Sequence, residues 1–172
     1  RGLPRNNLSH EEFRLLSWGI GLRAGVARPQ GLASQYIAAV RDIGTNYRAA
    51  NGRGYSSNAK LDFHVDGADL TTLTCYNKAK SGGQSMISSG VTAQSYLIKE
   101  RPVLAETAKE YFYFSRQSEQ ADDETPFYGQ PLFEEENGQL FCKWNRNRVQ
   151  SAQSLEGVPK LSSNQRETMD VL

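Results

Sequence analysis

The stretch Leu61-Asp62-Phe63-His64-Val65-Asp66-Gly67 decides how this chain is interpreted. Its apolar and polar residues alternate, which predicts a β-strand whose successive side chains point to opposite faces. His64 and Asp66 would then share one face, with Cα atoms about 6–7 Å apart. An imidazole and a carboxylate at this spacing can converge on one ion. They are two of the three ligands in the facial triad that holds non-haem Fe(II).

A His-x-Asp pair on its own is a weak signal, because it arises often by chance and is usually an ordinary hydrogen-bonded pair. His10 is the only other histidine, and its position at a helix start with acidic neighbours indicates a surface role. A site for another metal, such as zinc bound by His64 with Asp66, also stays open at this point.

The composition is that of one soluble globular domain covering residues 1–172. The net charge of +1 gives no indication of a nucleic-acid partner or of binding to an anionic membrane. No apolar run approaches the roughly 20 residues that span a bilayer. Cys75 and Cys142 are far apart in apolar runs, and we expect two buried free thiols in a reducing, cytoplasmic compartment. The expected partner is a small molecule, and homo-oligomers are left open.

Both ends predict an incomplete domain. The chain begins at Arg1 without a methionine and stops at Leu172 within a helix-like stretch. We therefore expect a segment of a longer protein.

Local signals predict helices between several strands. Capping boxes at Ser9 and Ser162 and a cap at Ser89 predict helix starts, Gly25 predicts a helix end, and Pro102 opens a short helix with Val103 and Leu104 buried. Strands are expected at 36–40, 61–67, 70–76, 84–88, 111–114, 127–136 and 139–144, with a hairpin turn at Asn137-Gly138. Residues 145–160 are expected to be a polar linker in which Arg146 and Arg148 are solvated. This order favours a mainly β fold, a jelly roll with inserted helices.

A longer pattern is more specific than the pair. The residues Phe63-His64-Val65-Asp66-Gly67-x-Asp69, Leu73-Thr74-Cys75 and Ala79-Lys80-Ser81-Gly82-Gly83-Gln84-Ser85, with Ser88, resemble the taurine dioxygenase-like (TauD/TfdA) family of Fe(II)- and 2-oxoglutarate-dependent dioxygenases. Upstream, Gly25-x-Ala27-x-x-Gln30 and Val40-Arg41-Asp42 are similar to members from secondary metabolism. The resemblance is densest over residues 55–105.

The resemblance implies a double-stranded β-helix, the jelly roll of this family. It implies that His64 and Asp66 are the first two iron ligands. Ser85 matches the position of a Thr or Ser near the 2-oxoglutarate carboxylate, where a hydroxyl can donate without adding charge. The implied reaction uses Fe(II), 2-oxoglutarate and O2 to hydroxylate, desaturate or rearrange a small-molecule substrate.

The family's third ligand is a distal histidine followed by an arginine that pairs with 2-oxoglutarate. No histidine follows Asp66, so neither role can be assigned to a residue of this chain. A two-ligand site would hold Fe(II) weakly. We expect the chain to be inactive if it is the whole polypeptide, and activity to belong to the parent protein if it is a fragment.

One alternative comes from a different functional class: a non-catalytic jelly-roll binding protein with a degenerate metal pair. The substrate is not encoded in a readable pattern. Specificity in such folds lies on loops, here 44–60 and 145–160, and their residues carry no recognisable motif.

Overall fold

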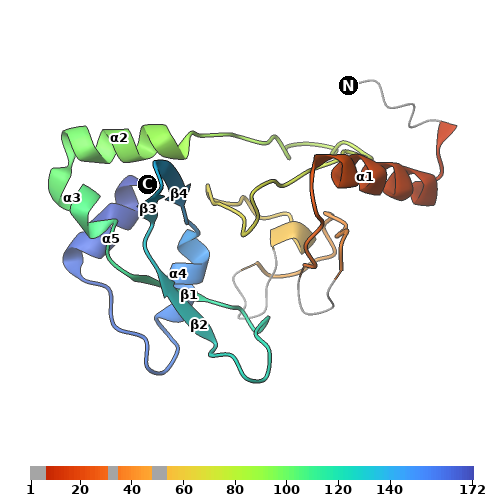
Figure 1. The fold of residues 1–172 in the computed structure, drawn as a ribbon. Helices are drawn as coiled ribbons and strands as arrows, with labels where there is room; N and C mark the ends of the chain where they lie inside the picture. The colour runs from red at the N-terminus through yellow and green to blue at the C-terminus, as the bar shows by residue number, and fades with distance from the viewer. Residues whose placement is uncertain (1–6, 31–34, 48–53) are drawn as a thin grey trace. The chain divides into compact units, whose positions relative to one another are not determined.

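The computed structural model describes residues 7–30, 35–47 and 54–172. Arg1, at the start of the chain, lies outside these ranges. Residues 48–53, part of the loop 44–60 expected to contact substrate, lie outside them as well. The chain forms two compact units, Arg1–Ala39 with Ala68–Ser85, and Val40–Gly67 with Met86–Leu172. Figure 1 labels the helices and strands.

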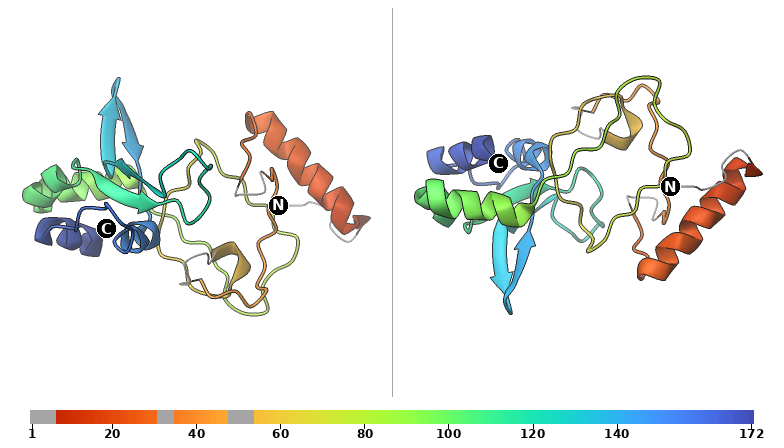
Figure 2. Two further views of the ribbon diagram at one scale, coloured as in Figure 1. Left: turned by 90° about the horizontal axis from the view of Figure 1, so that it is seen from below. Right: turned by 90° about the horizontal axis from the view of Figure 1, so that it is seen from above.

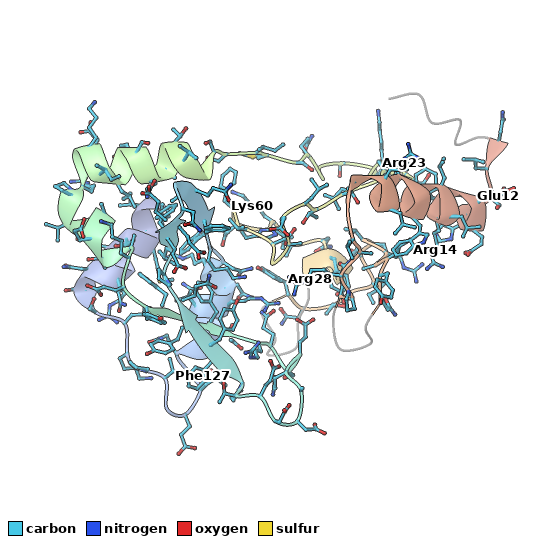
Figure 3. All side chains as sticks on the ribbon, in the orientation of Figure 1. Glu12, Arg14, Arg23, Arg28, Lys60 and Phe127 are labelled. Atoms are coloured by element: carbon cyan, nitrogen blue, oxygen red, sulfur yellow. The ribbon has the colours of Figure 1, made fainter. Side chains whose placement is uncertain are left out.

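In the described part of the first unit, α1 (His10–Ala24) has the start and end that the sequence predicts. The Ser9 amide donates to the Glu12 carboxylate at 2.8 Å, and the Glu12 amide donates to Ser9 Oγ at 3.2 Å. This capping box gives partners to two amides that a helix start would otherwise leave unpaired. Gly25 follows the last residue of α1, as the sequence predicts. The Glu12 side chain of the capping box can be found by its label in Figure 3.

The strands predicted at 36–40, 70–76 and 84–88 are absent from the structure. These residues are extended or bent without a strand partner. Aromatic contacts hold the first unit instead: the Phe13 and Tyr76 ring centroids are 5.1 Å apart, and those of Trp18 and Tyr36 are 5.6 Å apart. A strand needs a neighbouring backbone, so β-branched composition alone did not determine these segments.

The helices of the second unit start close to where the sequence predicts. A short 3-10 turn, η2 (Gly54–Ser56), comes before α2 (Gly90–Glu100), which is capped by Ser89, and α3 (Pro102–Thr107). Leu97 of α2 is fully buried and Leu104 of α3 is 4% exposed. The prediction that Val103 is buried is wrong, because its side chain points to the other side of the short helix and is 64% exposed.

Two antiparallel hairpins follow the helices. Strand β1 (Phe112–Ser115) pairs with β2 (Phe127–Gln130), and β3 (Phe133–Glu136) pairs with β4 (Gln139–Cys142). Asn137 and Gly138 have φ values of 52° and 75°, as a two-residue type I′ turn requires. The predicted strand 127–136 is divided in two, because the Leu132 amide leaves the ladder and donates to the Ala108 carbonyl at 2.9 Å. Both views of Figure 2 show the β3–β4 hairpin extending away from the helices of its unit.

The predicted polar linker 145–160 is wrong in its first half. Residues Arg146–Ala152 form α4, and the Asn145 side chain accepts from the Arg148 amide at 3.0 Å. Val149 and Ala152 are both fully buried. The two apolar residues lie three positions apart on one helix face, and the polar residues around them concealed this short amphipathic pattern.

The final helix confirms the second capping box. Helix α5 (Ser163–Val171) starts after Ser162, whose hydroxyl accepts from the Gln165 amide at 3.1 Å. The expected solvation of Arg146 and Arg148 is wrong. Arg146 pairs with Asp170 at 2.5 Å and Arg148 with Glu119 at 3.2 Å, so both guanidinium groups join segments of the unit.

The core of the second unit lies between its helices and its hairpins. Its buried apolar residues come from α2, α3, β1, β3, α4, α5 and the segments between them: Leu97, Leu104, Ala105, Ala108, Phe112, Phe114, Leu132, Phe133, Trp144, Val149 and Met169. The described residues build two two-stranded sheets and not a closed jelly roll. The predicted mainly β composition is therefore wrong for this part, because the stretch 61–88 supplies a single bridging residue in place of three strands.

Candidate metal centre

The segment 61–67 is extended but is not a strand. His64 and Asn145 form an isolated antiparallel bridge, and the Val65 amide donates to the Trp144 carbonyl at 2.8 Å. The predicted strand is wrong because pairing stops after this one bridge. The two side chains of the His-x-Asp pair nevertheless approach each other, and their role as metal ligands remains a prediction.

The His64 and Asp66 side chains face each other. Nε2 of His64 lies 3.6 Å from Oδ1 of Asp66, and the two side chains are 36% and 54% exposed. Nδ1 of His64 lies 2.9 Å from the Asp62 carbonyl oxygen. Because a carbonyl can only accept, this hydrogen bond places a proton on Nδ1, while Nε2 faces the carboxylate.

This donor set fits one ion. Nitrogen and oxygen donors lie about 2.0–2.2 Å from a bound transition metal, so two donors at a right angle are about 3 Å apart. A movement of about half an ångström from the observed separation would reach that distance. A histidine held by a backbone carbonyl through its other nitrogen is also the usual arrangement around a metal ligand. No third His, Cys, Asp or Glu joins the pair within the described ranges.

Ser85 belongs to the first unit, whereas His64 and Asp66 belong to the second. Its side chain is exposed, and it follows Gly82 and Gly83, whose φ values of 70° and 73° are the left-handed conformations expected of a tight glycine turn. The proximity of Ser85 to a bound 2-oxoglutarate remains a prediction.

Two residues near the pair were not singled out from the sequence. Asn145 is the bridge partner of His64, and Lys143 places its Nζ 3.8 Å from the position that a Cβ on Gly67 would occupy. Side chains alternate along a strand, so the expected strand 139–144 sets Lys143 on the face opposite Leu140, Cys142 and Trp144. The register between residues 64 and 145 carries no local signal, so the sequence gave no reason to connect Lys143 with the site.

The cysteines differ from each other. Both are free, as predicted, but Cys75 is exposed and only Cys142 is half-buried. Burial raises the pKa of the Cys142 thiol. The expectation of two buried thiols is wrong for Cys75, because the strand 70–76, in which its side chain was expected to be buried, does not form. His10 is exposed at the start of α1, as predicted.

The family assignment rests on the whole sequence. Residues 1–172 match the family described as Taurine catabolism dioxygenase TauD, TfdA family. The chain belongs to the TauD/TfdA family, which confirms the resemblance found in residues 63–88. Members of this family typically have a double-stranded β-helix fold and use Fe(II) and 2-oxoglutarate as oxidoreductases.

Two curated proteins are similar to this chain. FR-33289 synthase of Streptomyces rubellomurinus is 30% identical over 145 residues, which cover 84% of this chain and 43% of the relative. The taurine hydroxylase-like protein SAT17 of Stachybotrys chartarum is 28% identical over 111 residues, which cover 62% of this chain and 27% of the relative. The chain spans less than half the length of these curated relatives. Over the ranges that the structure describes, no helix has the length and apolar character to cross a membrane.

Proposed function

We propose that the protein containing this chain is an Fe(II)- and 2-oxoglutarate-dependent dioxygenase that oxidises a C–H bond of a small-molecule substrate. The observation that carries the proposal is the approach of His64 Nε2 to within 3.6 Å of Asp66 Oδ1 in a chain of the TauD/TfdA family. The chemistry is hydroxylation or a related oxidation. The setting we propose is secondary metabolism in the cytoplasm. The name of the Streptomyces relative, FR-33289 synthase, supports a biosynthetic role.

The roles follow from the donors. Fe(II), when bound, would supply O2 activation coupled to oxidative decarboxylation of 2-oxoglutarate. His64 Nε2 and the Asp66 carboxylate would hold the ion, and the Asp62 carbonyl would orient the imidazole through Nδ1. The Ser85 hydroxyl would donate to a carboxylate of 2-oxoglutarate. Further donors would come from the full-length protein.

Anaerobic titration of the full-length protein tests this function. Addition of Fe(II) and then 2-oxoglutarate should produce the visible charge-transfer band of a chelated complex. His64→Ala and Asp66→Ala should abolish the band. His10→Ala is the matched control, because it removes the only other histidine of the chain and should leave the band intact.

Two outcomes of this titration would contradict the proposed function. A band that persists in His64→Ala would show that the ion binds elsewhere. No band in the folded wild-type protein would favour the non-catalytic binding protein over the dioxygenase.

A further inference from the structure

The segment bridged to His64 carries a lysine two residues before the bridge. His64 faces Asn145 in the antiparallel bridge, and the Val65 amide donates to the Trp144 carbonyl. Lys143 precedes Asn145 by two residues, so in an extended chain the two side chains lie on the same face.

The Lys143 ammonium group lies beside the backbone that follows Asp66. Nζ is 3.8 Å from the position of a Cβ on Gly67 and 5.6 Å from the ring centroid of Tyr128. The side chain is half-buried. The lysine ammonium group thus lies near the Tyr128 ring and beside Gly67, the residue that follows Asp66 in the chain.

This charge has no carboxylate partner within the described ranges. Lys143 takes part in none of the ion pairs observed among the described residues of the second unit, which are His64–Asp66, Lys99–Glu100, Lys109–Glu106, Arg116–Glu124, Arg146–Asp170 and Arg148–Glu119. A partly buried ammonium group gains most from an anion, because a charge-assisted hydrogen bond replaces the hydration that burial removes. A contact with a tyrosine ring supplies only part of that gain.

We propose that Lys143 binds an acidic oxygen group, a carboxylate, sulfonate or phosphonate, of the small molecule held at the His64–Asp66 pair. The inference rests on the proposed function and narrows the ligand to an anion. The acidic group can belong to 2-oxoglutarate or to the oxidised substrate, and the chemistry at Lys143 is the same in both cases. Lys143 would then set the orientation of that molecule, with its charged end at Lys143 and its reacting end at the metal.

The test compares three variants of the full-length protein. Lys143→Gln removes the charge at similar length, and Lys143→Arg keeps it. Lys99→Gln is the matched control, because that lysine side chain is 82% exposed on α2. One arm measures the dissociation constant of 2-oxoglutarate anaerobically with Fe(II). The second arm measures binding of methanesulfonate and of inorganic phosphate by calorimetry, both to the 2-oxoglutarate complex and to the metal-free protein.

In Lys143→Gln, one of the two arms should weaken roughly tenfold or more, the loss expected for a hydrogen bond between charged groups. Lys143→Arg should retain most of the affinity, and Lys99→Gln should match the wild type. Loss in the first arm assigns the acidic group to 2-oxoglutarate, and loss in the second assigns it to the substrate. Wild-type behaviour of Lys143→Gln in both arms overturns the proposal, including the case in which the probe anions do not bind at all.

The two proposals fail separately. Absence of the charge-transfer band in the wild type overturns the dioxygenase function, and the calorimetric arm on metal-free protein still tests Lys143. A normal band together with unchanged anion and 2-oxoglutarate binding in Lys143→Gln overturns the role of Lys143 alone.

Discussion

Two regions of the second unit are held in different ways. The elements from α2 to α5 share a core in which Leu97, Phe112 and Phe114 are fully buried. The segment 61–67 contacts the residues between β4 and α4 through the His64–Asn145 bridge, which includes the Val65–Trp144 hydrogen bond, and Phe63 within it is 44% exposed. Burial of apolar area therefore maintains the fold, while the metal pair lies on a weakly attached, accessible segment. Substitutions in the first region should change stability, and those in the second should change ligand binding.

The largest effect on stability is expected in the core. Phe112→Ala should lower the free energy of unfolding by about 3–5 kcal/mol, because it deletes a fully buried ring. Phe141→Ala, which removes a ring that is 45% exposed on β4, should cost less than about 1 kcal/mol. Urea unfolding of both variants measures the contrast. Equal losses would show that the core is not where the structure places it.

The next effect concerns Arg148, which ties α4 to the segment after β1. Its guanidinium contacts the Glu119 carboxylate at 3.2 Å, and the two side chains are 28% and 23% exposed. Arg148→Met should lower the free energy of unfolding by about 1–3 kcal/mol. His64→Gln, which removes an exposed polar contact, should change it by less than about 0.5 kcal/mol. A larger loss of unfolding free energy in His64→Gln than in Arg148→Met would show that the segment 61–67 contributes more to stability than the Arg148 contact does.

Two glycines provide a smaller contrast in backbone conformation. Gly138 has a φ of 75° in the β3–β4 turn, and Gly138→Ala should destabilise the protein by about 1 kcal/mol. Gly19 lies inside α1 with open space around its Cβ position, and Gly19→Ala should stabilise by about 0.5–1 kcal/mol. Thermal unfolding of each variant shows whether the substitution raises or lowers stability. Stabilisation by Gly138→Ala would be inconsistent with a type I′ turn.

The smallest effect is a pH dependence at the start of α1. Hydrogen bonds from the Ser9 amide, and then from the Ser9 hydroxyl, hold the pKa of Glu12 below its usual value. The contribution of Glu12 to stability is therefore present above its unfolded pKa and is lost as the pH falls through its lower folded pKa. The difference in unfolding midpoint between the wild type and Glu12→Gln should shrink as the pH decreases from 7 toward 3. A difference that is constant across this range would argue against the capping contact.

The predictable features were those encoded in a few adjacent residues. Capping boxes at Ser9 and Ser162 and the turn at Asn137-Gly138 were confirmed, because each depends on hydrogen bonds or φ values within four residues. The His64–Asp66 contact belongs to the same group, because two residues of extended chain set it.

The unpredicted features depend on partners distant in the sequence. The strands expected between 61 and 88 need backbone partners, and composition cannot supply them. Lys143 could not be connected with His64 because the register that joins residues 64 and 145 is a property of the folded chain. Helix α4 was missed because its apolar face consists of only Val149 and Ala152.

The central claim is that the exposed His64–Asp66 pair binds a metal and contributes little to folding. Mn(II) binding to the full-length protein, measured by electron paramagnetic resonance for the wild type, Asp66→Asn and the neighbouring control Asp69→Asn, tests it most directly. Asp66→Asn should weaken Mn(II) binding by at least about tenfold without changing the unfolding midpoint, and Asp69→Asn should bind as the wild type does. Equal Mn(II) affinity of the wild type and Asp66→Asn would contradict the claim.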